Sequence, residues 1–322
     1  MDACCESRVS RRASFSSGPE VILRTIIGAS ILAMDHPPRL VLDDARPGRH
    51  LALDPEDIQH LVKVLRLQSG AAVEVLDGRG RCFTGTLGLE RRGATVAVGG
   101  AIREALEPGA SGSGMPRVEV LAPWPKGTRA GEAVGRLAQL GVAAWQPLVT
   151  AYTEAEARGD GEGRREKLAR VAREALKQCG GLHAMEVRRA LELSEAVRGA
   201  TTPPTVGMEA VLPMAPSDTG RTLVQAVPGW LPYCNFVLDP KAPVWISNQL
   251  LAELENRRGG AAGSGFRLWA GPEAGFSPSE LEALREAGFA FVRLSSAVLR
   301  IETALEAAAA IVLERCAAAD RP

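Results

Sequence analysis

The chain has 322 residues, 46% of them hydrophobic and 24% charged, a composition typical of a globular protein with room for two cores. Its 38 Lys and Arg residues balance 38 Asp and Glu residues, so the total charge indicates no particular partner, although local basic patches can still contact RNA. Its six cysteines form no C-x-x-C pair, its histidines show no metal-ligand spacing, and no stretch has the roughly 18 apolar residues of a membrane span; we expect no metal and no membrane partner.

We interpret residues 1–36 as a disordered or targeting extension. Three arginines and five serines lie within residues 1–20, and the apolar stretch VILRTIIGASILAM follows them. Arg24 interrupts that stretch, which disfavours a secretory segment, and acidic residues among the first 20 disfavour a typical transit segment. We therefore expect a cytoplasmic protein, with an organelle matrix as the alternative if the extension is a transit segment.

Residues 37–105 are expected to form a small β-barrel domain. The stretch VEVLDGRGRCFTGTLGLERRGATVAVGG alternates apolar and polar residues around turns at Asp77-Gly78 and Arg92-Gly93, a pattern typical of hairpins. One helix precedes it in DPEDIQHLVKVLRLQSG, with Asp54 as its N-cap and Pro55 in its first turn. Its apolar residues Ile58, Leu61, Val62 and Leu65 share one face. The Gly, Ser and Pro residues of 106–116 indicate a linker.

Residues 117–316 alternate strands with helices and therefore predict a parallel sheet with helices on both faces, an α/β fold. VEVLAPW, AAWQPLVT and YCNFVLDP are expected strands. AGEAVGRLAQLGV, residues 162–179 and WISNQLLAELENRR are expected helices. Residues near 200–232 are rich in Pro, Gly and Thr and are interpreted as an insertion.

The stretch WAGPEAGFSPSE places a glycine turn after a strand, and LSSAVLRIETA places Arg300 and Glu302 where the last helix begins. Turns at the carboxyl ends of neighbouring parallel strands form the usual ligand crevice of such a fold. The first turn lacks a phosphate-binding fingerprint, and Ser277 with Glu280 predicts a capping box. The alternatives are an ordinary strand-to-helix turn and, for Arg300 with Glu302, a helix-capping salt bridge.

Over about residues 38–315 the chain resembles the 16S rRNA uridine-N3 methyltransferases, a family of knotted, S-adenosylmethionine-dependent RNA methyltransferases. The resemblance rests on HLVKVLRLQSGAAVEVLDGRG, KGTRAGEAVGRLAQLGVAAWQPL, WAGPEAGFSPSE and LSSAVLRIETA, which occur in the family's order. It implies a PUA-like RNA-binding barrel followed by a trefoil-knot methyltransferase domain. It also implies S-adenosylmethionine as cofactor, a homodimer, and small-subunit rRNA or a 30S-type particle as partner.

The resemblance also suggests site residues. Arg300 would stabilise the anion that forms as uridine N3 loses its proton, and Glu302 would orient Arg300 or accept that proton. The cofactor would contact Leu238, Gly271, Pro272, Glu273, Ala274, Gly275, Leu294, Ser295, Val298 and Leu299. Core packing is the alternative for the apolar members. Basic residues expected to contact RNA phosphates are Lys63, Arg66, Arg79, Arg81, Lys126 and Arg129, with a solvated surface as the alternative.

Several positions depart from the family pattern. In the two loops, Ala274 and Ser295 replace glycines, Ala297 an arginine, Val298 an isoleucine and Ile301 a threonine. Elsewhere Tyr152 and Gly181 replace arginines, and Gly131 and Gln139 replace glutamates. Backbone contacts to a cofactor tolerate such changes better than catalysis does. We expect an active enzyme, with a catalytically weakened RNA-binding homologue as the alternative. A nucleotide-dependent oxidoreductase is disfavoured because the dinucleotide fingerprint is missing.

Overall fold

The computed structural model describes residues 36–91, 93–110, 113, 115–153, 161–201, 233–257 and 265–319. Residues 1–35 of the expected extension, and residues 202–232 of the expected insertion, lie outside the described residues. The described residues from Arg39 onward form one compact unit that contains two separate sheets. No helix in the described part of the chain is long and apolar enough to cross a membrane.

The first sheet has the strand order β1-β3-β4-β5-β2, in which β1 and β3 are parallel and the other neighbours antiparallel. The predicted turn between β3 and β4 is present, and the Asp77 carboxylate holds it by accepting the amides of Arg79 (2.7 Å) and Arg81 (2.9 Å). The strands are β1 (Arg39–Val41), β2 (His50–Ala52), β3 (Ala72–Leu76), β4 (Arg81–Glu90) and β5 (Gly93–Glu104).

The helix expected before β3 is only partly regular. It begins as α2 (Pro55–Ile58) and continues as a wider π-helix, η1 (Gln59–Val64). The expected N-cap residue, Asp54, has extended backbone but its side chain makes no capping hydrogen bond. Leu61 is buried in the core of the first sheet, because the predicted apolar face of this segment packs against that sheet.

The second sheet is entirely parallel, as predicted. Its strand order is β12-β10-β11-β6-β7-β8, and β9 also pairs with β7. The strands are β6 (Arg117–Ala122), β7 (Ala144–Val149), β8 (Glu186–Val187), β9 (Leu191–Glu192), β10 (Tyr233–Leu238), β11 (Gly265–Trp269) and β12 (Ala290–Val292).

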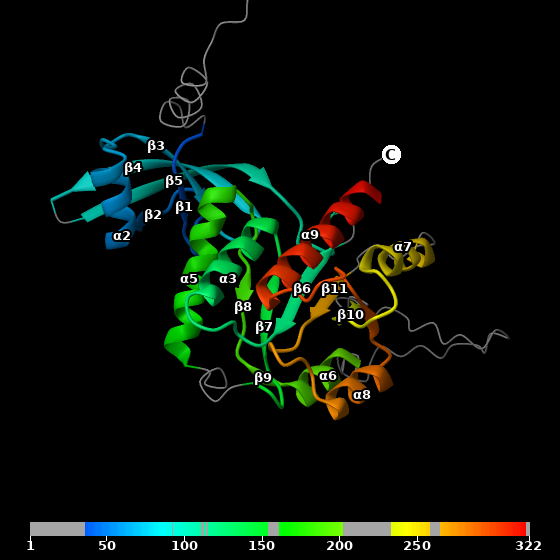
Figure 1. Cartoon of the computed structure of the whole chain (residues 1–322). Coiled ribbons are helices and arrows are strands. Elements are labelled where there is room, and N and C mark those ends of the chain that lie inside the picture. Colours follow the sequence, from blue (N-terminus) through cyan, green and yellow to red (C-terminus); the bar gives the residue numbers. More distant parts are fainter. Residues whose placement is uncertain are drawn as a thin grey trace, which may run out of the picture. The chain divides into compact units, whose positions relative to one another are not determined.

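Helices cover both faces of this sheet (Figure 1). Alternation along β6 sends Val118 and Val120 into a core with α3, α5, α7 and α9, while Leu121 joins a second core with α6 and α8. The helices are α3 (Arg129–Leu140), α5 (Glu162–Cys179), α6 (Leu193–Thr201), α7 (Ile246–Arg257), α8 (Pro278–Glu286) and α9 (Ile301–Ala319).

Complementary charges join α5 to the first sheet. Arg173 contacts Asp43 at 2.6 Å and Lys177 contacts Asp57 at 2.6 Å, beside a small apolar cluster that includes Leu76 and Leu176. Two acidic residues of the first domain, Asp43 and Asp57, therefore hold α5. Another, Glu104 on β5, lies 3.6 Å from Arg81, one of the basic residues predicted to contact RNA.

A buried charge cluster lies at the amino ends of the parallel strands. The Glu119 carboxylate accepts hydrogen bonds from Arg188 (2.9 Å), Arg117 (3.1 Å), Arg267 (3.1 Å) and the Tyr233 hydroxyl (3.1 Å). Burial alone would raise the pKa of Glu119, but the surrounding guanidinium groups outweigh burial and lower this pKa to about 2. Glu119 is therefore ionised and fully paired.

Candidate active site

A cavity of about 540 Å³ lies at the carboxyl ends of β10, β11 and β12. This volume lies within the range of small-molecule sites, and the position is the crevice expected for an open parallel sheet. Its lining includes the turn after β10, loop 271–276 after β11 and segment 294–301 after β12. All ten residues that the sequence suggested for cofactor contact lie around this cavity: Leu238, Gly271, Pro272, Glu273, Ala274, Gly275, Leu294, Ser295, Val298 and Leu299.

The loop after β11 is tight because its backbone folds back on itself. A Cβ added to Gly271 would lie 2.8 Å from the Gly275 carbonyl carbon and 2.9 Å from the Phe276 nitrogen, so only glycine fits there. Gly275 has φ 78° and donates its amide to the Pro272 carbonyl at 2.7 Å. The predicted capping box is confirmed, since Ser277 and Glu280 each bond the other's backbone amide. Loop 271–276 therefore offers backbone polar groups to the cavity at close range.

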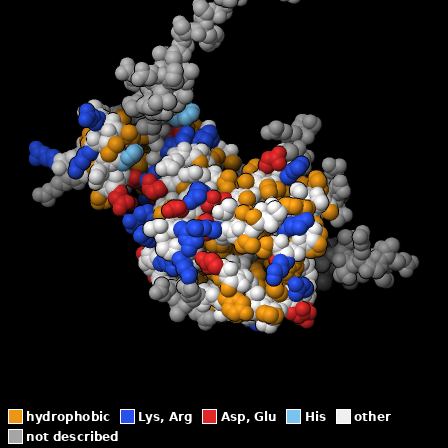
Figure 2. Space-filling view, viewed as in Figure 1, with side chains coloured by type: hydrophobic (Ala, Val, Ile, Leu, Met, Phe, Trp, Pro, Cys, Tyr) orange, Lys and Arg blue, Asp and Glu red, His pale blue; other side chains and the backbone are white. Residues whose placement is uncertain are grey.

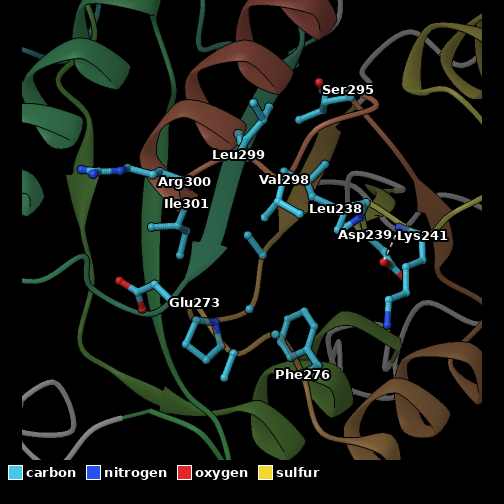
Figure 3. A pocket seen from close by; sticks show the side chains of 18 of the residues that line it. Leu238, Asp239, Lys241, Glu273, Phe276, Ser295, Val298, Leu299, Arg300 and Ile301 are labelled. Carbon is cyan, nitrogen blue, oxygen red and sulfur yellow. Dashed lines mark hydrogen bonds between the residues drawn. The ribbon is translucent and has the colours of Figure 1, made fainter.

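The segment after β12 brings apolar side chains to the other side of the cavity. Val298 is 83% exposed, whereas Ile301 beside it is buried. Core packing was the alternative role for these apolar residues, and the exposure of Val298 excludes that role for it. Figure 3 shows Val298 and Leu238 on the side of the cavity opposite Glu273 and Phe276. The Ser295 hydroxyl accepts the Ala297 amide at 3.0 Å and so shapes the turn that holds this segment.

Arg300 and Glu302 are placed differently from each other. Arg300 lines the cavity but is exposed, and Figure 3 shows its side chain extending to the same side as Glu273, away from Leu238. Within the described ranges Arg300 has no ion-pair partner. Glu302 is buried and contributes no atom to the cavity lining; its Oε1 accepts from Arg129 at 3.3 Å. Glu302 therefore pairs with Arg129 and does not form the salt bridge with Arg300 that was the alternative expectation.

Arg129 links three parts of the site. It begins α3, pairs with Glu302 at the start of α9, and contacts Glu273 of loop 271–276 at 3.5 Å. Glu302 Oε2 is buried without a hydrogen-bond partner among the described residues. The carboxylate is therefore only half satisfied, unlike Glu119 at the other end of the sheet.

The residues predicted to bind RNA do not all meet in one place. Lys63 and Arg66 lie before β3, whereas Arg79 lies in the turn at its other end and Arg81 begins β4. All four are exposed, as is Lys126 after β6. Figure 2 shows Lys and Arg side chains gathered over the surface where α3 and α5 lie, and α5 carries Arg164, Arg165, Lys167, Arg170, Arg173 and Lys177. We did not expect this basic surface on α5 from the sequence.

Sequence reasoning also missed two charged residues of the cavity. Asp239 and Lys241 line it from the turn that follows β10, where the Asp239 carboxylate accepts the Lys241 amide at 2.8 Å. Their position directly after the expected strand YCNFVL could have indicated them. Among the described residues no three His, Cys, Asp or Glu side chains gather as metal ligands would.

Comparison with known proteins supports the resemblance. A profile of the RNA methyltransferase domain matches residues 113–227 and 231–313, and a profile of the RNA methyltransferase PUA domain matches residues 53–98. No curated protein matches the chain significantly.

Two solved structures show the same fold. The ribosomal RNA small subunit methyltransferase E of Neisseria gonorrhoeae, bound to S-adenosyl methionine, is 20% identical with a TM-score of 0.60, over 85% of this chain and 96% of that one. A Legionella pneumophila protein in complex with bound SAM is 22% identical with a TM-score of 0.62, over 87% of this chain and 98% of that one. The expected fold class, a PUA-like domain followed by a parallel-sheet α/β domain, is confirmed. The chain belongs to the RNA methyltransferase family.

Proposed function

We propose that this protein transfers a methyl group from S-adenosylmethionine to N3 of a uridine in small-subunit rRNA. The observation that carries the proposal is the cavity, because three loops that are separate in sequence place ten expected cofactor residues around one space. The two relatives described above are solved with S-adenosylmethionine bound, and the family assignment is to an RNA methyltransferase domain.

The lining suits the parts of this cofactor. Apolar side chains such as Leu238 and Leu294 offer a surface for a flat adenine, and the backbone of loop 271–276 can approach its polar edge. Charged groups for the ribose hydroxyls and the amino acid portion are present on Asp239, Lys241 and Glu273. The bound cofactor supplies an electrophilic methyl group, and the protein supplies the position of the acceptor base.

The acceptor nitrogen carries a proton that has to leave during methyl transfer. Arg300 lies exposed at the rim, where a guanidinium can stabilise the imide anion of an incoming uridine. Glu302 lies behind Arg129, so we assign to it the orientation of the rim rather than contact with the base. Exposed basic residues on the barrel and on α5 would hold the RNA backbone. The trefoil knot and the homodimer stay predictions from the family resemblance.

A methylation assay on small-subunit particles that lack the modification tests the proposal. Labelled S-adenosylmethionine should give N3-methyluridine at one position, located by mass spectrometry of RNA fragments. Binding of the cofactor without any methylated product would contradict the proposed reaction. It would favour the catalytically weakened RNA-binding homologue, which the loss of family arginines at Tyr152, Gly181 and Ala297 supports.

Arg300→Ala tests the role of the arginine within that reaction. We expect turnover to fall about 100-fold, a typical effect of removing one anion-stabilising group, with little change in cofactor affinity. Arg315→Ala is the matched control, an exposed arginine on α9, the helix that begins directly after Arg300, and it should keep full activity. Equal losses of turnover and cofactor affinity in Arg300→Ala would contradict the assignment.

A further inference from the structure

Arg129 makes contacts that a phosphate-binding arginine does not need. Its Nη1 lies 3.3 Å from Glu302 and its Nη2 lies 3.5 Å from Glu273. Each nitrogen of the guanidinium fork thus reaches a different carboxylate, which Arg can do and Lys cannot do equally well. A phosphate approaching Arg129 would have to displace one of these two partners.

The two partners of Arg129 differ in exposure. The Glu302 side chain is 9% exposed, that of Arg129 29% and that of Glu273 54%. A buried charged hydrogen bond loses more when broken than an exposed one, because water cannot replace the lost partner. Glu302 is therefore the fixed anchor on α9, and Arg129 extends from it to the outer loop.

The two loops that Arg129 connects come from different strands. Loop 271–276 follows β11 and segment 294–301 follows β12, and these strands lie on opposite sides of β10. Among the residues that the structure describes, no hydrogen bond or ion pair joins the two loops directly. Arg129 therefore supplies their polar connection, by way of Glu273 on one loop and Glu302 directly after the other.

We propose that Arg129 is a positioning residue that holds loop 271–276 against the start of α9 and so sets the width of the cofactor cavity. This proposal rests on the proposed function, because it concerns the cavity assigned to S-adenosylmethionine. Without Arg129, Glu273 keeps no ion-pair partner in the described part of the chain, and the loop is free to move away from segment 294–301. The buried carboxylate of Glu302 loses its ion-pair partner at the same time.

The chain offers a matched control two turns further along α3. Arg136 also bridges two carboxylates, Glu132 at 2.9 Å and Glu306 at 3.4 Å, but none of the three lines the cavity. Arg129→Gln and Arg136→Gln therefore remove the same kind of interaction from the same helix. Only the first releases a cavity loop.

The test is calorimetric titration of S-adenosylmethionine into the full chain and both variants. We expect Arg129→Gln to weaken cofactor affinity about 10-fold and Arg136→Gln to change it less than 2-fold. Arg129→Lys should recover only part of the loss, because one ammonium cannot span both carboxylates. Melting temperatures of all variants establish that each one is folded.

A double-mutant cycle shows whether Arg129 acts through Glu273. Glu273→Gln breaks the same connection and also removes a carboxylate offered to the cofactor, so the double variant Arg129→Gln/Glu273→Gln should lose clearly less affinity than the sum of the two single losses. Fully additive losses would overturn the proposal. If wild type bound the cofactor and Arg129→Gln bound it equally well, the proposal would also fail.

Measurements of RNA binding distinguish the positioning role of Arg129 from the phosphate contact that its charge suggested. We expect Arg129→Gln to leave RNA affinity and its salt dependence unchanged. A salt slope lowered by about one, with unchanged cofactor affinity, would assign Arg129 to a phosphate and overturn the proposal. Failure of the wild-type chain to bind S-adenosylmethionine would instead overturn the proposed function, and this inference with it.

Discussion

The two ends of the parallel sheet both hold buried glutamates beside arginines, but only one end is fully paired. At the amino ends, Glu119 accepts hydrogen bonds from three arginines and one tyrosine. At the carboxyl ends, Glu302 has Arg129 as its ion-pair partner and a second oxygen that is buried without a partner among the described residues. The first end is closed by its own charges, whereas the second lies next to a cavity.

This difference indicates which charged cluster stabilises the fold and which belongs to a site. A buried carboxylate with all its bonds made gains nothing from a ligand, while a half-satisfied one beside a cavity retains capacity for a further interaction. The same amino acid pair therefore occurs in two settings, and the link of Glu302 to the cavity through Arg129 and Glu273 distinguishes them. The number of donors alone does not, because Glu306, away from the cavity, also has a buried oxygen without a partner among the described residues.

The largest effect on stability is expected at the amino ends. Glu119→Gln leaves three arginines around a neutral amide, and we expect a loss of about 3 to 5 kcal/mol in the free energy of unfolding. Denaturant unfolding measures this loss. Glu186→Gln is the control, since the exposed Glu186 pairs with Arg188 alone and should cost less than about 1 kcal/mol. Similar losses in the two variants would contradict the comparison.

The low pKa of Glu119 predicts a dependence of stability on pH. The folded-state pKa of about 2 lies below the ordinary glutamate pKa of 4.5, so the ionised form stabilises the folded chain. This stabilisation, roughly 3 kcal/mol, is present above pH about 4.5 and is lost as pH falls toward 2. Denaturant unfolding between pH 5 and 3 should show it. Glu119→Gln should lose that part of the slope; an unchanged slope would assign acid unfolding to other carboxylates.

Glycine substitutions in the loop after β11 are expected to have an intermediate effect. Gly271→Ala places a Cβ 2.8 Å from backbone atoms, so the loop has to move and cofactor affinity should fall at least 10-fold. Gly275→Ala meets no atom within 4 Å and carries only the strain of its positive φ, of order 1 kcal/mol. Calorimetry on both variants measures the difference, and a larger loss of affinity in Gly275→Ala would contradict the assignment of the tight contact.

The smallest effect on stability is expected for Glu302→Gln. The amide oxygen can still accept from Arg129 and the amide nitrogen replaces an oxygen that has no partner, so unfolding should change by less than about 1 kcal/mol. Turnover should nevertheless fall, because the charge that anchors Arg129 is lost. A stability loss as large as that of Glu119→Gln would remove the distinction between the two ends.

Much of the fold followed from patterns within single segments. Alternating strands and helices predicted the parallel sheet, and the sequence from Ser277 to Glu280 predicted the capping box, because both depend on neighbouring residues. The wide turn of η1 was not predicted, since the hydrophobic face is compatible with more than one helical geometry.

The loop positions of the candidate site could be predicted from the sequence, because glycine and apolar residues define the backbone shape there. The ion pairs between long charged side chains could not. Glycine and apolar positions of the two loops lie around the cavity, as the resemblance suggested. Arg129 and Glu302 pair with each other but lie 173 residues apart in the sequence. No local sequence pattern predicts such a pairing. Three of the four donors to Glu119 come from β10, β11 and the segment between β8 and β9, and they were missed for the same reason.

The most direct test of the account is calorimetric titration of S-adenosylmethionine into the purified wild-type chain and into Gly271→Ala. We predict one bound cofactor per wild-type chain, and affinity at least 10-fold weaker in the variant at unchanged helix content. No binding to the folded wild-type chain, or equal binding to both proteins, would contradict the assignment of the cavity.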